Sequence, residues 1–298
     1  MYTRREFATL LLAGAAGARL HPDTTVFAQA AANSMVHGVR VGVQTYSFRQ
    51  LTRPPTGDMV DVIINAMTEC GLSQCELWSP QLLPAGVPRE EQRRWCLETP
   101  LDHFRMIRTK FNNARMAIHA FNHSFNDSFS DQDIDRGFEM ARALGAEYIT
   151  ASSTLSSAKR VAPFAEKHKM IVAMHNHHDL KDPNEFATPA SFAAASKMSK
   201  YFKINLDLGH FVAANFDPVP YVREHHASIT NLHVKEGRKG GGDFVPWGQG
   251  DTPIREVLQL IKKNKWPIAA DIEYEYKGAG TPVEEVKKGL EYVRQALA

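Results

Sequence analysis

Cysteine is scarce in this sequence, which contains only Cys70, Cys75 and Cys96 among its 298 residues. An odd number of cysteines at these spacings fits neither a disulfide framework nor a zinc-finger motif. A small domain held together by disulfide bonds is therefore excluded. We interpret all three cysteines as small, buried, apolar residues.

An excess of charge of one sign is also missing. The 35 Lys and Arg residues nearly balance the 33 Asp and Glu residues and leave a net charge of +2. So small a charge does not indicate a nucleic-acid or membrane-surface partner. The hydrophobic fraction of 43% and the charged fraction of 23% are typical of a globular protein with ample material for a core.

Long apolar runs, linkers and low-complexity stretches do not occur in the sequence beyond residue 40. No segment in that part is long and apolar enough to cross a membrane, so we expect no stable membrane association. Because no linker divides them, residues 38–298 are expected to form one domain.

The first thirty residues have the layout of a secretory signal. A charged start at residues 3–7, with paired arginines followed by x-Phe, precedes an apolar run over residues 8–18 and a small-x-small sequence at residues 28–30. The start resembles a twin-arginine export signal. The alternative, an amphipathic first helix, is disfavoured by two glycines inside the apolar run. We expect residues 1–30 to be removed and the protein to be periplasmic or otherwise exported.

Short apolar runs rich in β-forming residues alternate with amphipathic stretches beyond residue 40. The predicted strands are Val41–Phe48, Gln74–Trp78, Met116–Phe121, Tyr148–Ser152, Ile171–His175, Lys203–Leu208, Ile229–Val234 and Ile268–Tyr274. Apolar residues at helical spacing predict helices between them, for which the clearest stretches are Met59–Cys70, Ile134–Leu144, Ala190–Met198, Ile254–Lys263 and Val283–Leu297. Strands separated by helices favour parallel pairing.

Eight strand–helix units in about 260 residues fit a closed barrel better than an open sheet. The predicted fold class is therefore α/β, a (β/α)₈ TIM barrel. In such a barrel the active site lies at the carboxyl ends of the strands. Polar residues at those ends are the candidates for catalysis, whereas a polar residue in mid-strand faces a filled core and needs a partner.

Four consecutive predicted strands end in imidazole or carboxylate groups. The segments are His175–Asp179, Asp207–His210, His233–Glu236 and Asp271–Glu275. A single surface histidine or aspartate is usually only solvated, but four successive strand ends of this kind are far less expected by chance. A mixed set of histidine and carboxylate ligands is typical of a divalent metal site with open positions.

These segments, together with others, resemble the xylose-isomerase-like barrel superfamily, whose members include sugar phosphate isomerases and epimerases. The resemblance covers roughly residues 38–297. It rests on Gly42–Arg49, Glu76–Trp78, His175–His177, Asp207–His210, His233–Lys235, Pro246–Asp251 and Ile272–Tyr274. It implies a barrel enzyme that binds a small carbohydrate next to a metal ion.

The resemblance further implies one metal ion held by a carboxylate, an aspartate, a histidine and a glutamate from four successive strands. Asp207, His233 and Glu273 match the last three positions. No glutamate stands at the first position, after strand Ile171–His175, and we expect His177 there instead. Two imidazoles and two carboxylates favour Mn²⁺, Zn²⁺ or Co²⁺ over Mg²⁺.

The fourth ligand stays open between His177 and two loop residues, Asp179 and Glu185. His175 lies two residues before His177, so it faces the same side but lies deeper in the barrel. His175 is either a substrate contact or a hydrogen-bonded core histidine.

Proton transfer requires a base and an acid beside the metal. Glu273 is expected to serve as both ligand and base, with His177, His210 or Lys235 as the acid. His210 follows Asp207 by three residues, which places it within reach of a substrate. Lys235 follows His233 by two residues on the same face, where it could stabilise an enediolate oxygen.

Further substrate contacts are expected from Glu76, His119 and Trp247. The alternative for Glu76 is a salt bridge to a neighbouring loop, and for His119 a polar layer near the barrel mouth. The long loop at residues 237–251 carries three consecutive glycines and is expected to act as a substrate lid. It lacks the Gly-Lys-Ser/Thr ending of a phosphate-binding loop.

These features together predict a metal-dependent isomerase or epimerase that moves protons on a keto-sugar or sugar-like polyol. The main alternative is a metal-dependent lyase or dehydratase on keto-sugars, inososes or 3-keto-glycosides, because the missing strand carboxylate weakens a symmetric two-glutamate epimerase. A sugar-binding protein without turnover is less favoured. An abasic-site endonuclease is disfavoured by the small net charge and by too few metal ligands. No oligomeric state is predicted.

Overall fold

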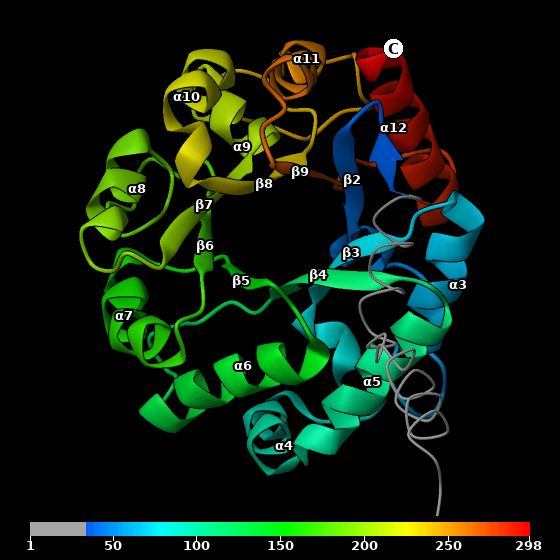
Figure 1. The fold of residues 1–298 in the computed structure, drawn as a ribbon, viewed down its shortest axis with the longest axis vertical. Helices are drawn as coiled ribbons and strands as arrows, with labels where there is room; N and C mark the ends of the chain where they lie inside the picture. Colours follow the sequence, from blue (N-terminus) through cyan, green and yellow to red (C-terminus); the bar gives the residue numbers. More distant parts are fainter. Residues whose placement is uncertain (1–33) are drawn as a thin grey trace, which may run out of the picture.

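The strands of the computed structural model, which describes residues 34–298, close into a parallel barrel (Figure 1). Neighbouring strands follow the order of the chain, and the first barrel strand pairs with the last. The barrel strands are β2 (Val39–Gln44), β3 (Gln74–Trp78), β4 (Ala117–Asn122), β5 (Tyr148–Ala151), β6 (Val172–His175), β7 (Phe202–Asp207), β8 (Ile229–Val234) and β9 (Ala269–Ile272). The short strand β1 (Met35–Val36) adds an antiparallel hairpin to β2. The expected export signal lies outside the described residues.

Helices surround this barrel, as the alternating sequence pattern predicts (Figure 1). They are α3 (Val60–Cys70), α4 (Gln92–Glu98), α5 (Leu101–Asn113), α6 (Asp131–Leu144), α7 (Leu155–His168), α8 (Pro189–Ser196), α9 (Leu208–Ala213), α10 (Pro218–His225), α11 (Ile254–Asn264) and α12 (Pro282–Leu297). The (β/α)₈ TIM barrel is thereby confirmed. Within residues 34–298, no helix has both the length and the apolar character that crossing a membrane requires.

Side-chain caps determine where several of these helices begin. In α12 the Thr281 hydroxyl accepts a hydrogen bond from the Glu284 N–H, and the Glu284 carboxylate accepts one from the Thr281 N–H. The same reciprocal arrangement begins α6, α7 and α8. Such caps satisfy N–H groups that no helical carbonyl can reach. Each of these helices therefore starts at a defined residue after its loop.

The core lies between the barrel and the helices. In α11 the apolar residues Ile254, Val257, Leu258 and Ile261 are all buried, as their spacing predicts. The three cysteines are free thiols, of which Cys70 and Cys75 are buried and Cys96 is half-buried. Burial raises the pKa of the Cys96 thiol to about 11, and that of Cys70 to about 12. Thiols with such pKa values are poor nucleophiles at neutral pH.

One predicted strand is shorter in the structure than in the sequence analysis. The run Val41–Phe48 leaves the barrel at Gln44, and its second half forms the 3₁₀ turn η1 (Thr45–Phe48). The Gln44 side chain accepts a hydrogen bond of 3.0 Å from the Tyr46 N–H and so caps this turn. The turn brings aromatic Tyr46 to the end of the barrel strand, where sequence pattern alone extends the strand past it.

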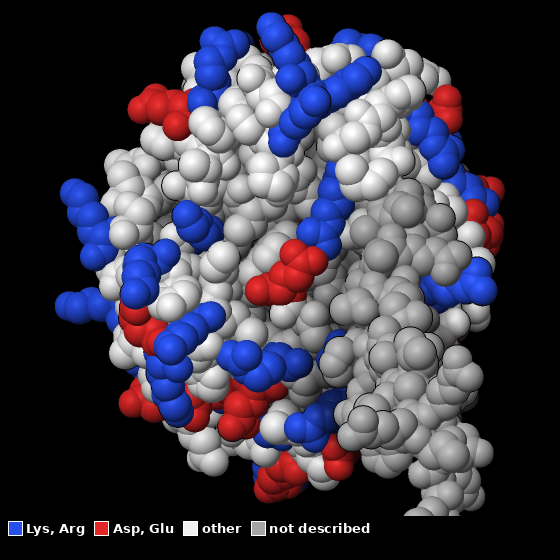
Figure 2. All heavy atoms as spheres, viewed as in Figure 1, with Lys and Arg blue, Asp and Glu red and all other residues white. Residues whose placement is uncertain are grey.

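Charged side chains of both signs are interspersed around the rim of the face drawn in Figure 2. This distribution agrees with the near balance of acidic and basic residues in the sequence. The face is hollowed near its centre, and acidic side chains lie at the edge of the hollow (Figure 2).

A buried histidine directly after β4 has no polar partner for one of its ring nitrogens. The His123 ring stacks on Phe121, with ring centroids 5.4 Å apart, and meets Phe125 edge-on at 5.1 Å. Its Nδ1 is buried without a hydrogen-bond partner among the described residues. Burial lowers the pKa of His123 to about 4, against a weaker opposing effect of Asp133. The ring is therefore uncharged at neutral pH.

His123 predicts a specific acid sensitivity of the fold. The unfolded chain binds a proton at His123 below about pH 6.5, whereas the folded chain does so only below about pH 4, so stability falls as the pH drops through this window. Between pH 7 and pH 4.5 the unfolding free energy of the parent chain should fall by about 2–3 kcal/mol more than that of His123→Phe. Urea unfolding at the two pH values measures this loss.

The control for this prediction is His226→Phe. His226 is half-exposed and stacks on Trp266 at the surface, so the variant should keep the pH dependence of the parent chain. Equal pH dependence in the His123→Phe variant and the parent would contradict the prediction.

Candidate metal centre

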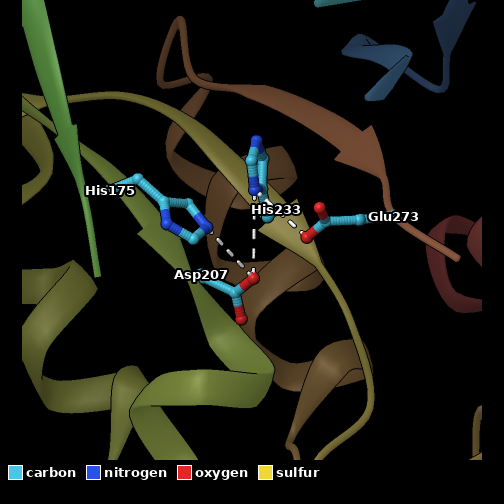
Figure 3. Close-up of side chains that lie close together, drawn as sticks. All are labelled: His175, Asp207, His233 and Glu273. Atoms are coloured by element: carbon cyan, nitrogen blue, oxygen red, sulfur yellow. Dashed lines mark ion pairs between the residues drawn. The ribbon is translucent and has the colours of Figure 1, made fainter. Parts of the chain in front are cut away.

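Four side chains from four consecutive strands converge at one end of the barrel (Figure 3). His175 and Asp207 are the last residues of β6 and β7, His233 lies on β8 directly opposite Asp207, and Glu273 follows β9. Each offers one ligand atom, and the four atoms lie within 4.8 Å of one another. The parallel register of the strands thus brings together residues that are up to 98 positions apart in sequence.

The distances and burial within this group suit a cation. Asp207 Oδ2 lies 3.4 Å from His175 Nε2 and 3.9 Å from His233 Nδ1, and Glu273 Oε2 lies 3.2 Å from His233 Nδ1 (Figure 3). All four residues are at most 5% exposed.

One atom of each of these four residues is buried with no hydrogen bond of good geometry to any described residue. The atoms are His175 Nε2, Asp207 Oδ2, His233 Nδ1 and Glu273 Oε2. Buried polar atoms without a partner are rare and costly in folded proteins. Here they are the same atoms that face one another. The two carboxylate oxygens also have the Lys235 ammonium at ion-pair distance, whereas the two imidazole nitrogens do not. A single divalent ion bound among them would give a ligand bond to all four. The donor set therefore fits a metal ion.

In three of the four ligands, His175, Asp207 and His233, the opposite atom is held by the protein. Asp207 Oδ1 accepts a hydrogen bond of 2.7 Å from the His210 N–H, which leaves Oδ2 free to face the group. His175 Nδ1 lies 3.2 Å from Ser152 Oγ. His233 Nε2 lies 3.0 Å from Glu76 Oε2. A carboxylate behind a histidine in this way orients the ring and selects the nitrogen that faces a metal.

Lys235 supplies positive charge to the carboxylates. Its ammonium lies 2.9 Å from Asp207 Oδ2, 2.9 Å from Glu273 Oε2 and 2.5 Å from Glu275 Oε2. Burial acts to raise the pKa of Glu273, but Lys235 and His233 outweigh it and hold that pKa well below its usual range. Burial lowers the pKa of Lys235, yet the carboxylates around it raise that pKa overall and keep the ammonium charged.

The two histidines of the group have opposite proton affinities. Burial lowers the pKa of His175 well below its usual value, so its ring is neutral and presents a lone pair. Burial also acts to lower the pKa of His233, but Glu76 and Glu273 raise it well above the usual value. A metal ligand must be deprotonated, so binding of a cation at His233 is coupled to release of a proton.

The structure brings His175 into the group, and not His177. The chain has already left the barrel at His177, whose N–H donates to the Phe186 carbonyl and whose Nδ1 lies 3.4 Å from Glu185 Oε2. Asp179 also lies outside the group. The converging group thus contains His175 where we expected His177 or its alternatives Asp179 and Glu185. The reason is depth: the in-strand histidine lies level with Asp207 and Glu273.

Three residues expected to contact a substrate do not line the cavity at this centre. Glu76 is fully buried, and its carboxylate is bonded by side chains from neighbouring strands. His119 lies between the Tyr148 hydroxyl at 3.0 Å and Asp271 Oδ1 at 2.8 Å, which is the polar layer considered as its alternative. Trp247 packs edge-on against Tyr292. Glu76 and His119 thus support the site from below.

A cavity of about 260 Å³ opens above the four converging residues. His210 and Lys235 line it, as expected, and His177 stands at its edge with a side chain that is 40% exposed. The lining residues that were not predicted from the sequence are Gln44, Tyr46, Trp78, Asn122, Ser124, Ser152 and Glu275. Glu275 had a usable signal, because it lies two residues beyond Glu273 on the same side of an extended segment.

The long loop at residues 237–251 reaches this cavity through Phe244. The Phe244 ring meets His210 edge-on at 4.8 Å, and the Lys235 ammonium lies 4.5 Å from its centroid. His210 Nδ1 also lies 2.7 Å from His178 Nδ1. Burial, followed by Lys235, lowers the pKa of His210 well below its usual value, so this ring is neutral. The loop thereby packs an aromatic ring against two residues that line the cavity, His210 and Lys235.

Comparison with known proteins gives one family match and many structural ones. The family described as "Xylose isomerase-like TIM barrel" matches residues 117–296. No curated protein matches the chain significantly in sequence.

Three solved structures illustrate the structural likeness. An L-ribulose 3-epimerase shares 12% identity at a TM-score of 0.64, with 87% of this chain and 94% of the other covered. The IOLI protein, solved with a bound zinc atom, shares 13% identity at a TM-score of 0.64, with 87% and 99% covered. A sugar phosphate isomerase/epimerase from Parabacteroides distasonis shares 16% identity at a TM-score of 0.58, with 85% and 95% covered. Identities this low support the fold alone.

The choice between the two histidines generates a direct prediction. His175→Ala removes one of the four converging ligand atoms and should weaken Zn²⁺ binding by about 100-fold or more. His177→Ala, the matched control two residues away, should change it by less than about threefold. Competition with a chromophoric chelator on metal-stripped protein measures both affinities. The reverse order of effects would restore His177 as the ligand.

Proposed function

The chain belongs to the xylose isomerase-like TIM barrel family, and from this premise we propose that it is a divalent-metal-dependent isomerase or epimerase of a keto-sugar or sugar-like polyol. The observation that carries the proposal is the set of four buried ligand atoms that converge at the strand ends, beside the charged Lys235 and below an open polar cavity. In a barrel of this kind that end is where catalysis takes place.

We propose His175, Asp207, His233 and Glu273 as the metal ligands. A divalent ion bound there supplies Lewis acidity, which stabilises negative charge on a substrate carbonyl oxygen. Two imidazoles and two carboxylates favour Zn²⁺, Mn²⁺ or Co²⁺ over Mg²⁺. The zinc atom in the IOLI structure supports this preference.

Glu273 is the proposed base. Its Oε2 faces the ligand group, which leaves Oε1 to take a proton from the carbon next to the carbonyl. Lys235 and His233 hold the pKa of Glu273 well below its usual range against the effect of burial, so this carboxylate is ionised at neutral pH. Its position on the wall of the cavity puts it within reach of a bound sugar.

Lys235 and the histidines complete the proton transfer. The Lys235 ammonium donates hydrogen bonds from inside the same cavity and stabilises negative charge that develops on a substrate oxygen. The rings of His177 and His210 lie edge to face, with centroids 5.1 Å apart, on the side of the cavity formed by β6 and β7. His177 is the proposed imidazole that returns the proton, because its side chain is 40% exposed at the cavity edge whereas burial keeps the His210 ring neutral.

His175 in place of a carboxylate distinguishes this site from a symmetric one. A pair of carboxylates on opposite sides of a sugar would remove and return a proton with equal ease, whereas a neutral imidazole at one side does not. This asymmetry favours isomerisation, and it keeps lyase chemistry as the second candidate. Loss of a β-substituent after proton removal would give an unsaturated carbonyl product with ultraviolet absorbance.

Proton exchange with solvent tests the proposed function. The Zn²⁺- or Mn²⁺-loaded protein should incorporate deuterium from D₂O at a carbon of at least one ketose in a panel, as detected by NMR. Glu273→Gln should lower that exchange by about 10²–10⁴-fold through loss of the base. Glu275→Gln, which alters a carboxylate that contacts Lys235 but lies outside the ligand group, should lower it by less than about tenfold.

The outcomes of this test separate the candidates. Full exchange by a metal-loaded Glu273→Gln variant would contradict the assigned base. Absence of exchange with every ketose would leave a sugar-binding protein, and a rise in ultraviolet absorbance without isomerised product would select the lyase.

We also propose export by the twin-arginine route, on the charged start at residues 3–7 and the apolar run that follows. Replacement of Arg4 and Arg5 by lysine should retain the full-length chain in the cytoplasm, because twin-arginine recognition requires the paired arginines. Cell fractionation and the mass of the exported chain measure this. Unchanged export of the double variant would contradict the route.

A further inference from the structure

A second cavity adjoins the one at the metal centre. It has a volume of about 340 Å³ and lies between the segments that follow β3 and β4 on one side and the helices α4 and α6 on the other. Trp78 and Ser124 line both cavities. The wall between them therefore consists of side chains that a single ligand could touch on both sides.

The second cavity differs in chemistry from the first. Its apolar lining comes from Trp78, Leu83, Leu97, Phe129 and Met140, whereas the first is lined mainly by imidazole, carboxylate, amide and hydroxyl groups. Apolar and aromatic walls with a few polar groups are typical of small-molecule sites. The Trp78 ring is held edge-on against Tyr46, with centroids 4.8 Å apart, so its orientation at the junction is defined.

Charged side chains at the second cavity are already paired within the protein. Arg93 forms an ion pair with Asp133, and its guanidinium lies 5.7 Å from the centroid of the Phe129 ring. Arg136 donates to the backbone carbonyls of Cys96 and Thr99. With its charges compensated in this way, the cavity suits an uncharged ligand better than a phosphate or a carboxylate.

His123 provides an independent sign of a ligand. Its side chain lines the second cavity, the residue is only 8% exposed, and its Nδ1 has no hydrogen-bond partner among the described residues. A neutral imidazole without a partner can exchange a hydrogen bond with a hydroxyl or ether group. Because this nitrogen has almost no accessible surface, the ring must turn toward the cavity to bond such a group, and that bond would remove the cost of the unsatisfied nitrogen.

We propose that this second cavity is a subsite for an uncharged ring attached to the sugar at the metal centre. The inference rests on the proposed function and extends it: the substrate is a sugar with a second ring, a glycoside or similar conjugate, and not a free monosaccharide. The sugar occupies the polar cavity, the link passes Trp78 and Ser124, and the second ring packs against the apolar wall with one polar group at His123.

Ketose derivatives test this subsite on the metal-loaded protein. D-Fructose is compared by calorimetry with three disaccharides that keep its free keto group, namely turanose, lactulose and isomaltulose, and with 6-O-benzyl-D-fructose. At least one derivative should bind about tenfold more tightly than fructose, because a ring in contact with aromatic walls adds to the shared ketose contacts. The disaccharides and the benzyl ether distinguish a sugar ring from an aromatic one.

Variants locate the preference in the second cavity. Leu97→Trp fills the cavity from its half-exposed rim and should lower the affinity of the preferred derivative to that of fructose, with fructose binding unchanged. Arg94→Trp places the same ring on the same helix outside the cavity. It should change neither the affinity for the derivative nor that for fructose. His123→Phe keeps the ring stacking but removes both nitrogens, and should lower the affinity for the derivative about fivefold if that derivative carries a polar group.

The outcomes separate the subsite from the proposed function. The subsite is overturned if no derivative binds more tightly than fructose. It is also overturned if Leu97→Trp lowers the affinities for fructose and for the derivative equally. Removal of the metal should weaken fructose and the derivative alike, since both share the ketose. Metal removal could instead leave the affinities for fructose and for the derivative unchanged, while Leu97→Trp still abolishes the tighter binding of the derivative. In that case the metal-dependent function fails and the subsite stands.

Discussion

A carboxylate buried at the centre of the barrel is the constraint on which the candidate site depends. Glu76 accepts hydrogen bonds from Asn122 on β4, Thr150 on β5 and Asn231 on β8, and it contacts His233. A buried charge without such partners would cost several kcal/mol. With them, it joins strands on opposite sides of the barrel. Because Glu76 engages Nε2 of His233, the other nitrogen faces the converging carboxylates, and the four ligand atoms meet.

Charge balance above this layer explains how so many ionisable groups share a buried site. Asp207, Glu273 and Glu275 all lie within 2.9 Å of the Lys235 ammonium, which offsets their mutual repulsion. His175 adds no charge, because burial keeps it neutral. The centre thus provides lone pairs and negative charge for a cation while a fixed ammonium remains beside the open cavity. The adjoining apolar cavity, by contrast, has its charges paired and presents mainly rings and aliphatic side chains.

The barrel could be predicted from periodicity and chain order, and three of the four converging residues from the family resemblance applied to the strand ends. Alternating strands and helices imply parallel pairing, and parallel strands carry their final residues to the same end. Depth along a strand could not be predicted so well. His175 and His177 differ by two residues and share a face, so only the point at which β6 ends decides which one lies level with Asp207. The same uncertainty in depth placed Glu76 and His119 at the substrate, although both lie in the layer below it.

By itself the sequence determined the fold class, because alternating strands and helices depend on local periodicity and chain order. The same order puts imidazole and carboxylate groups at neighbouring strand ends, and the family resemblance selects Asp207, His233 and Glu273 among them. Only the tertiary structure decided that His175 completes the group, that Lys235 pairs with three carboxylates and that a second cavity adjoins the first at Trp78. Those features depend on the register between strands and on side chains far apart in the chain, such as Trp78 and Glu273, which line one cavity only when the barrel closes.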